Sequence, residues 1–571
     1  MGLGILEPHT DEPVPGTVHL QAEAGRRLRN RSRLKHGTGR HADIVLAPQP
    51  SDSPNDPLNW SRARKLYTSI FLSIGTGLMA GTHNFVNPAN SQLAKTFQTN
   101  ISTISQSVSI VLLTLGISAV FSSPLARIWG KRPVILVGNA LATIGYVIAV
   151  SKPGNLTALY VGRAIHGLGI SPLEYLVSSS VGDLFFVHER GVHLALWHYA
   201  LSGGNAIGQV IGTQILAAQG WLWPFYYTII AFALYTIIYL FTCPETTYNR
   251  PHWLDIDIEE EVAENSSLEG GGSGDKSDNN RVASQKSSNP VTTEVRDFEG
   301  GGSSDAPISY WQGLKIYNRR FSDESPVRSL LTPWTAFMLP AVSWAGFSYG
   351  CSVAFSASFS VALGQIFTKP PYNLTTSQVG LSAFSSFIAA TLGNAIPGPV
   401  CDWLVKFLSR KNKGVYEPEF RLILSVPSLI LGLMGFWGFG LSLEGKSDFM
   451  VPVFFYGLSV FAGSINSLIS NAYLLDCHRP QAQDGYAAVT ITRGVYSFAM
   501  TFVINGWLSR DGYKVVYFWI GFLHGLSCII GIALYFFGKK ASPLAGAEGL
   551  VRYAVAKNKF IQSRIATRKI I

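Results

Sequence analysis

Three charged side chains lie inside long apolar stretches of the sequence, and they are the residues best suited to do chemistry. They are Arg163, Glu174 and Arg493. A charge in a hydrocarbon environment is costly, so each is a candidate functional residue. Glu174 is the clearest carboxyl group in such a stretch, and a desolvated carboxyl group can bind and release a proton near neutral pH. The alternative is that Glu174 forms a structural ion pair with a basic loop residue.

The spacing between Arg163 and Glu174 determines whether the two side chains can form an ion pair. Eleven residues put the two side chains on nearly the same face of a helix. They would lie about 16 Å apart along its axis, so they cannot pair directly. A chain of polar groups through His166 could link them. Arg493 could bind an anionic group, or it could pair with Glu174 or Asp476.

Other polar and aromatic residues in the apolar stretches could line a cavity. His198 is the best-placed histidine for carrying protons near pH 6.5, because Trp197 and Tyr199 flank it. A lone histidine, however, more often bonds to a neighbouring helix. The remaining cavity candidates are Asn84, Trp344, Tyr349, Asn466 and Tyr496. Tryptophan and tyrosine also anchor helices at membrane interfaces, and that alternative stays open for each of them.

The composition indicates which elements must position these residues. The chain has 571 residues, of which 47% are hydrophobic and 14% are charged, whereas soluble domains have about 25% charged residues. This excludes a soluble enzyme, a secreted disulfide-rich domain and a disordered chain. Between the charged segments lie apolar segments of membrane-spanning length, which must be helical because open strands leave backbone groups unpaired in lipid. The twelve segments are 66–86, 101–126, 133–150, 156–180, 192–219, 221–243, 334–360, 376–400, 422–443, 449–475, 486–507 and 515–537.

Lysine and arginine predict how these helices are oriented. The connection between the second and third segments contains Arg127, Lys131 and Arg132, and the connection between the eighth and ninth contains five basic residues at 406–421. The opposite connections carry mostly single charges. Both termini and the central loop are therefore expected in the cytoplasm. The possible glycosylation sites on the outer loops are Asn100, Asn155 and Asn373.

The middle of the chain differs from the rest. It contains GGGSG and GGGSS among many Ser, Asn and Asp residues, a composition that favours a flexible linker. Near its end, Tyr310, Trp311 and Ile316 are interleaved with basic residues, which favours either a short interfacial helix or an ordinary basic loop. The predicted division is a basic cytoplasmic tail (1–65), a six-helix bundle (66–243), a linker (244–330), a second six-helix bundle (331–538) and a basic cytoplasmic tail (539–571).

An internal repeat relates the two predicted bundles. SPLAR at 123–127 ends the second segment, and GPVCD at 398–402 ends the eighth. Each consists of a small residue, a proline, an aliphatic residue, a small residue and a charge. Two related six-helix halves can enclose a cavity near the bilayer midplane and rock between two openings. Gly204, Gly208 and Gly212 add a smooth ridge for close helix packing.

With these motifs, the sequence resembles the major facilitator superfamily over about residues 56–540. The family's motif after its second helix, Gly-x-Leu-x-Asp-Arg-x-Gly-Arg-Lys, is similar to SPLARIWGKR at 123–132, and the fourth-helix motif is similar to RAIHGLG at 163–169. DPLNW at 56–60, PET at 244–246 and NKGVYEPEFR at 412–421 look like the fungal twelve-span drug:proton antiporters. That branch also includes polyamine and cation carriers.

Two departures from the family pattern matter. Arg127 stands where the family has Asp, which should weaken the usual ion-pair gate of the first half. The fifth segment lacks the Gly-Pro that the family associates with export, and this leaves the direction of transport open. The gating loops implied by the resemblance consist of Arg127, Gly130, Lys131, Arg132, Gly398 and Asp402.

The resemblance implies an all-α polytopic membrane protein with two six-helix bundles. The leading hypothesis is a monomeric, proton-coupled exporter of a small organic compound, such as a drug, toxin or secondary metabolite. We expect it in the plasma membrane, and a vacuolar or other internal membrane is the alternative. Glu174 would be the first candidate for the coupling proton, in a charge network with Arg163, Arg493 and His198. The alternatives are uptake of a small cation or polyamine and a non-transporting receptor on the same scaffold.

Some other functions are excluded or not expected. GLSLEGKS at 440–447 matches a phosphate-loop pattern, but it closes an apolar helix at the outer face, so ATP-driven pumping is excluded. The net charge of +10 reflects basic residues on one membrane face rather than nucleic-acid binding. The five cysteines lack paired spacing, so we expect neither a metal site nor a disulfide, and no cofactor.

Overall fold

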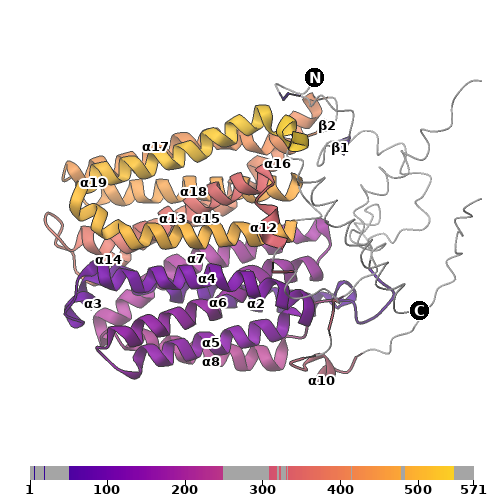
Figure 1. Ribbon diagram of the computed structural model, residues 1–571, viewed down its shortest axis with the longest axis horizontal. Helices are drawn as coiled ribbons and strands as arrows, with labels where there is room; N and C mark the ends of the chain where they lie inside the picture. The colour runs from indigo at the N-terminus through magenta and orange to yellow at the C-terminus, as the bar shows by residue number, and fades with distance from the viewer. Residues whose placement is uncertain are drawn as a thin grey trace, which may run out of the picture.

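The structure is a computed structural model that describes most of both predicted helical regions. The described residues are 5–6, 18–19, 50–248, 308–317, 320–322, 329–330, 332–412, 415–477 and 482–544. Most of the predicted tails and of the predicted linker lies outside the described residues. The two ordered halves of the chain lie side by side, the first in indigo to magenta and the second in red to yellow (Figure 1).

The first half is built from six long helices. They are α2 (Arg62–Asn84), α4 (Ile101–Trp129), α5 (Lys131–Ser151), α6 (Leu156–Leu184), α7 (Val187–Gln219) and α8 (Trp223–Thr242). The short helices beside them are η2 (Pro57–Asn59), η3 (Asn87–Ala89) and α3 (Asn90–Thr96). Gly130 and Gly220, with φ of 96° and 95°, separate α4 from α5 and α7 from α8, because glycine adopts a positive φ without steric cost.

The second half repeats the plan with more interruptions. The helices that form its crossings are α13 (Pro340–Phe367), α14 (Thr376–Leu381), α15 (Ala383–Ala395), α16 (Pro397–Lys411), α17 (Ser425–Glu444), α18 (Met450–Cys477) and α19 (Ala482–Leu544). Its short elements are α10 (Tyr310–Gly313), α12 (Thr332–Ala336), β2 (Val415–Tyr416) and η5 (Pro418–Leu424). Together α14, α15 and α16 form the eighth crossing, and α19 contains the last two crossings with a bend at Gly512.

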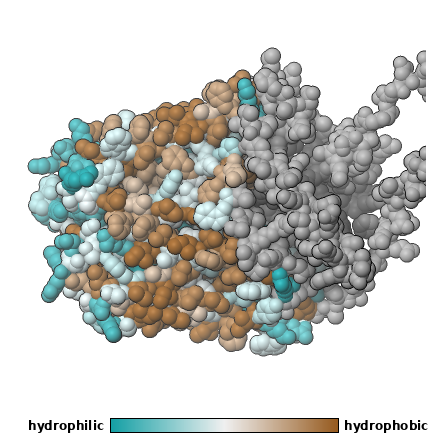
Figure 2. Space-filling model, viewed as in Figure 1, coloured by the Kyte–Doolittle hydropathy of each residue, from teal (hydrophilic) through white to brown (hydrophobic). Residues whose placement is uncertain are grey.

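The helices have the length and composition of membrane spans. Within the described ranges, eight segments are apolar and long enough to cross a bilayer, and one of them covers both crossings of α19. The helices α2, α6 and α7 are not among the eight, and these three carry many of the polar side chains discussed below. With the two crossings of α19 counted separately, the eight segments and these three helices give the twelve predicted spans. Apolar residues cover the sides of the visible face, and polar ones gather at one end (Figure 2).

Two pairs of crossings bring the two halves together. Helix α4 packs on α19, and α7 packs on α14 and α15. We call the end that carries the 2–3 and 8–9 connections the basic end, and the opposite end the outer end. At the basic end, the N-terminal tail contacts the second half. Leu6 N–H donates to Phe536 O at 3.0 Å, and β1 (Val18–His19) pairs antiparallel with β2.

Candidate functional site

A cavity of about 150 Å³ lies between the two halves, in the middle of the helices. It is lined from both sides, by α2, α4, α6 and α7 of the first half and by α13, α15, α18 and α19 of the second. Its polar lining consists of His83, Asn84, Glu174, His198, Ser202, Asn205, Tyr349, Ser352, Ser356, Ser386, Tyr456, Ser464, Ser467 and Arg493. Hydroxyl and amide groups therefore outnumber charges around it.

Glu174 and Arg493 form a two-pronged ion pair on the cavity wall. Nη1 of Arg493 donates to one carboxylate oxygen of Glu174, and Nη2 donates to the other. Both side chains are less than a tenth exposed, so each charge is compensated mainly by the other. Because Glu174 lies on α6 and Arg493 on α19, the pair joins the two halves. The structure thus pairs Arg493 with Glu174 rather than with Asp476, and Glu174 with a helix residue rather than a loop residue.

Arg163 and His166 do not extend this pair. Nη1 of Arg163 donates to the carbonyl of His83 at 3.0 Å, and its guanidinium lies 5.5 Å from the rings of Phe85 and Phe225. Nδ1 of His166 faces the carbonyl of Ala142 on α5 at 3.4 Å. The predicted polar chain from Arg163 through His166 to Glu174 is therefore not what the structure contains, because His166 points toward α5.

His198 makes a second polar contact between the halves. Its Nδ1 lies 2.7 Å from Oδ1 of Asn394 on α15, and Nδ2 of Asn394 donates to Ser202 at 2.8 Å. Trp197 and Tyr199, which flank His198 in sequence, do not line the cavity. Trp197 packs against the apolar core of the first half, and the ring of Tyr199 faces Phe387.

Amide side chains surround the outer part of the cavity. Nδ2 of Asn84 donates to Oδ1 of Asn205 at 2.7 Å, and Nδ2 of Asn87 donates to Oδ1 of Asn84 at 2.8 Å. Asn205 and Asn394 were not among the sequence candidates. The available signal was an amide in an apolar segment, which does not by itself say which way the side chain points.

The remaining cavity candidates divide by location. Tyr349 lines the cavity, whereas Trp344, Asn466 and Tyr496 do not. The indole of Trp344 donates to Ser527 O at 3.0 Å. Nδ2 of Asn466 donates to Ser352 Oγ at 3.1 Å. A buried polar group needs a hydrogen-bond partner, and Trp344 and Asn466 each find one on a neighbouring helix of the second half. The ring of Tyr496 packs against Phe347.

Uncharged side chains connect the halves at the outer end. Three of these contacts are Asn87 to Ser360 at 3.0 Å, Ser377 to Gln214 at 2.6 Å and Thr501 to Ser109 at 2.8 Å, and Asn505 also bonds to Ser105. The two halves are thus in close contact at this end. In the middle of the helices, next to Arg493, α4 and α19 also touch at Gly116 and Gly494, where a Cβ on Gly494 would lie 2.8 Å from the Cα of Gly116.

The predicted glycine ridge lies against α2. A Cβ on Gly204 would lie 2.5 Å from the carbonyl oxygen of Gly77, and one on Gly208 or Gly212 would overlap Gly81 or Phe85. The absence of side chains at these positions lets α7 approach α2 closely.

The three sequons lie in exposed positions at the outer end. Asn100 and Asn155 are the N-cap residues of α4 and α6. Oδ1 of Asn155 accepts a hydrogen bond from Thr157 N at 2.9 Å. Asn373 lies in the loop between α13 and α14, with φ of 48°.

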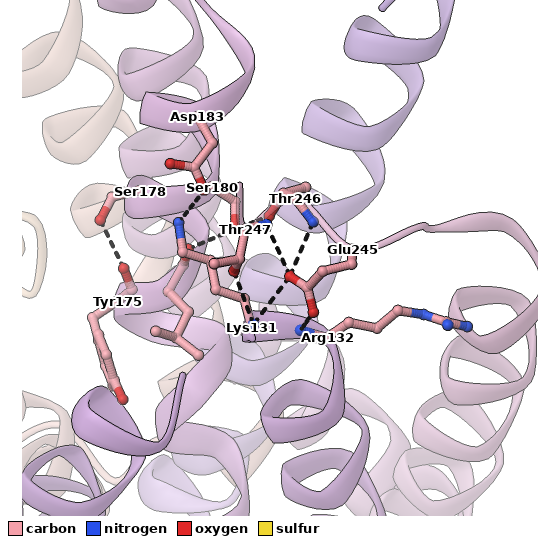
Figure 3. A network of polar contacts seen from close by, with 10 residues as sticks. Lys131, Arg132, Tyr175, Ser178, Ser180, Asp183, Glu245, Thr246 and Thr247 are labelled. Carbon is pink, nitrogen blue, oxygen red and sulfur yellow. Dashed lines mark hydrogen bonds and ion pairs between the residues drawn. The ribbon is translucent and has the colours of Figure 1, made fainter. Parts of the chain in front are cut away.

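At the basic end, the carboxylate of Glu245, just after the end of α8, binds the loop between α4 and α5, which we call the 2–3 loop. Glu245 accepts hydrogen bonds from the backbone N–H groups of Lys131 and Arg132 at 3.1 and 3.0 Å, and also from those of the two threonines that follow it. Nζ of Lys131 lies 2.5 Å from Asp183, at the end of α6. Figure 3 shows these side chains converging on the start of α5. Arg127, in the last turn of α4, stands beside this loop.

The guanidinium of Arg132 connects three segments. It donates to the carbonyls of Leu240 and Lys315, each at 2.6 Å. Gly130 must be glycine for two reasons, because its φ is 96° and because a Cβ there would overlap the carboxylate of Glu245. The PET sequence at 244–246 and the 2–3 loop are therefore parts of one structure.

The second half has a corresponding network. Nε of Arg421 lies 2.5 Å from Asp476, the hydroxyl of Tyr416 also donates to Asp476, and Asp402 lies 3.8 Å from Arg421. Asp402 is two-thirds exposed, and Gly398 has open space around it. Burial, together with the neighbouring carboxylate of Asp476, raises the pKa of Tyr416 well above its ordinary value, so this hydroxyl remains a donor.

Comparisons with known proteins agree with this architecture. Residues 72–501 match the Major Facilitator Superfamily. The chain is 25% identical to Protein HOL1 of Saccharomyces cerevisiae, over 92% of this chain and 95% of that protein. It is 22% identical to the MFS antiporter QDR3 of Candida albicans, over 90% and 82%. Its fold resembles the proton:xylose symporter XylE, with a TM-score of 0.53, 14% identity, and 83% and 97% coverage. The chain belongs to the Major Facilitator Superfamily and is a multi-pass membrane transporter of the fungal type rather than an enzyme.

Proposed function

We propose that this transporter couples proton movement to the export of a small organic compound by alternating access. The observation that carries the proposal is the ion pair between Glu174 and Arg493. It lies on the wall of the central cavity, it is almost fully buried, and its two members belong to different halves of the chain. A change in the charge of one member would therefore act on the contact between the halves.

The coupling step follows from the cost of separating buried charges. While Glu174 is ionised, moving α6 away from α19 would leave two uncompensated charges in a medium of low dielectric constant. When a proton from the cavity binds to a carboxylate oxygen of Glu174, the attraction for the Arg493 guanidinium is lost and the halves can separate at this point. Release of the proton restores the pair, which couples proton occupancy to the rocking of the two halves.

The cavity lining supports a largely uncharged substrate. Most of its polar groups are hydroxyls and amides, with the aromatic rings of Tyr349 and Tyr456 among them. Such groups can orient a small organic molecule by hydrogen bonds while apolar side chains enclose the rest of it. Export is the direction we infer because one relative is named as an efflux pump. Export from the cell would require the plasma membrane, and a single chain encloses the cavity, so a monomer suffices.

A second function, uptake of a small cation, is favoured by one observation. Among the cavity-lining residues that the structure describes, Glu174 carries the single carboxylate, and a carboxylate can bind a cation. A cationic substrate could displace Arg493 from Glu174 and so take over the role that we assign to the proton. The receptor alternative from the sequence has no such observation in its favour.

Transport by reconstituted vesicles would test these proposals. The purified protein would be placed in liposomes with an imposed pH gradient, and a panel of radiolabelled neutral, cationic and anionic organic compounds would be offered. Glu174→Gln should abolish gradient-driven accumulation but preserve exchange of compound across the membrane. Glu444→Gln makes the same chemical change at an exposed position on the outer end of α17 and should behave like the parent.

The possible outcomes separate the two functions. Gradient-driven accumulation by Glu174→Gln at the parental rate would reject Glu174 as the proton carrier. Loss of both accumulation and exchange, restricted to cationic compounds, would favour direct cation binding by Glu174. If none of the compounds moved in the parent, the transport of small organic molecules would itself be in doubt.

A further inference from the structure

A short segment at the end of the linker presents large apolar side chains to its surroundings. Residues 308–317 include α10, and we call them the linker segment. Four of their bulky side chains are 56% exposed and Trp311 is 70% exposed. Within this segment only Leu314 is buried. Exposed side chains of this kind, gathered within ten residues, need a partner that is not part of the described chain.

The segment is nonetheless fixed to the first half through its backbone and one hydroxyl. The hydroxyl of Tyr310 donates to Phe241 O at 2.6 Å, at the end of α8. The guanidinium of Arg132 donates to Lys315 O at 2.6 Å. Ile308 N–H donates to Asn55 Oδ1 at 2.8 Å. These contacts hold the main chain against the bundle, while the apolar side chains remain exposed.

The position of the segment identifies its partner. The outward side of α8 exposes a stripe of apolar residues, each 53–61% exposed, namely Ile230, Leu234, Ile237 and Phe241. In a membrane transporter such a stripe faces lipid. Tyr310 bonds to the last residue of that stripe, so the linker segment begins where the lipid-facing surface ends (Figure 1). The two exposed surfaces are continuous.

Other residues at the basic end have the pattern of a membrane interface. Trp129 ends α4, Trp334 lies just before α13, and Trp403 lies on α16, and these three are 42%, 51% and 63% exposed. Tryptophans gather where the hydrocarbon gives way to headgroups. In and beside the linker segment, Lys315 and Arg320 are also exposed, and basic residues at this level attract anionic lipids.

We propose that the linker segment binds the surface of the bilayer, with Trp311 and Ile316 among the lipid headgroups and Lys315 near anionic phospholipids. Because Arg132 of the 2–3 loop donates to the carbonyl of Lys315, this attachment fixes the end of the linker beside the loop that joins α4 and α5. The lipid surface then becomes a third support for that loop, besides Glu245 and Asp183. This inference concerns the membrane surface and does not depend on the proposed substrate or on proton coupling.

Site-directed spin labelling of the full chain in lipid nanodiscs would test it. A nitroxide at Trp311→Cys should collide more with oxygen than with a water-soluble nickel reagent, as expected at a membrane interface. Ile237→Cys on the lipid-facing stripe gives the deep reference, and Lys152→Cys on an exposed outer loop gives the water reference. Ile316→Cys is a second probe in case the tryptophan variant is unstable.

Lipid composition provides the second arm. One basic residue near an anionic surface contributes about 1 kcal/mol, so replacing phosphatidylserine by phosphatidylcholine should lower the ratio of membrane-bound to unbound label about fivefold. Lys315→Gln should remove most of this dependence. A label at 311 that matches the Lys152→Cys reference in both lipids would overturn the proposal. Protection of the label from both reagents would overturn it too, because a polypeptide would then cover the segment.

Discussion

At the basic end, each half of the molecule has an ion pair between its third and fourth crossings, but the residues around the two pairs differ. In the first half, Lys131 at the start of α5 pairs with Asp183 at the end of α6. In the second half, Arg421 just before α17 pairs with Asp476 at the end of α18. Each pair joins the third crossing of its half to the fourth. The internal repeat therefore extends to the placement of ion pairs, beyond the similarity of residues 123–127 and 398–402.

The two networks differ in the second carboxylate, which lies at the loop after the second crossing of each half. In the second half it is Asp402, directly after the second crossing, and it lies 3.8 Å from Arg421. In the first half Arg127 occupies the matching position, and Glu245 from beyond the sixth crossing supplies the carboxylate instead. Glu245 binds backbone N–H groups rather than a cationic side chain. The chain thus retains an anion at this loop, although Arg127 suggested that the first-half gate would be weak.

Replacement of the paired aspartate in each half should have the largest effect on stability. Asp476→Asn leaves both Arg421 and Tyr416 without their carboxylate, and we expect a loss of about 3 kcal/mol in unfolding free energy. Asp183→Asn should lose roughly half as much, because Asp183 is more exposed and the partner that it loses is a flexible lysine. Thermal unfolding of both variants in detergent would measure this order. A larger loss for Asp183→Asn would contradict the ranking.

The glycines of the two matching loops should also differ. Gly130→Ala combines a strained φ with an overlap on Glu245, and we expect it to cost about 2 kcal/mol. Gly398→Ala places its Cβ in open space and should change stability by less than about 0.5 kcal/mol. Unfolding measurements on the pair would show whether the 2–3 loop is the tightly fitted one. Equal effects would mean that it is not.

The sequence was sufficient for the spans but not for the contacts between them. Twelve apolar segments follow from hydrocarbon length, and the non-helical backbone at Gly512 divides α19 into two crossings, in agreement with the predicted segments 486–507 and 515–537. Glu174 and Arg493 stood out because charges in apolar segments are costly. Their pairing could not be derived from the sequence, because the two residues are 319 positions apart. Nothing in the sequence favours Glu174 over Asp476 as the partner of Arg493.

The same limit explains the misplaced cavity candidates. Trp344 and Asn466 lie in apolar helices, as Tyr349 does, and nothing in the sequence says which face of a helix meets the cavity. Each of the two buried groups finds a partner on a neighbouring helix, which only the packing reveals. Serines such as Ser352 and Ser464 line the cavity but are too common in membrane helices to be informative.

A smaller effect should follow from the change of Glu245 to glutamine. The carboxylate accepts several backbone N–H groups, whereas an amide offers one acceptor and a donor that faces the same N–H groups. We expect a loss of about 1–2 kcal/mol and faster hydrogen exchange at the amides of Lys131 and Arg132. Asp402→Asn is the matched control and should leave exchange in the 8–9 connection nearly unchanged, since Asp402 is mostly exposed. Unaltered exchange in Glu245→Gln would show that this carboxylate does not hold the loop.

The smallest expected effect concerns pH and Tyr416 of the second-half network. Burial and Asp476 raise the pKa of Tyr416, so the folded protein keeps this proton above about pH 10, where an unfolded chain loses it. The stabilisation is therefore complete below pH 10 and declines as the pH rises toward the folded-state value. Tyr416→Phe should cost about 1 kcal/mol at neutral pH, and its deficit relative to the parent should shrink in alkaline solution. Unfolding from neutral to alkaline pH would measure this convergence, with exposed Tyr317→Phe as the control that should track the parent throughout. A deficit that stays constant would indicate that Tyr416 contributes packing rather than a hydrogen bond to Asp476.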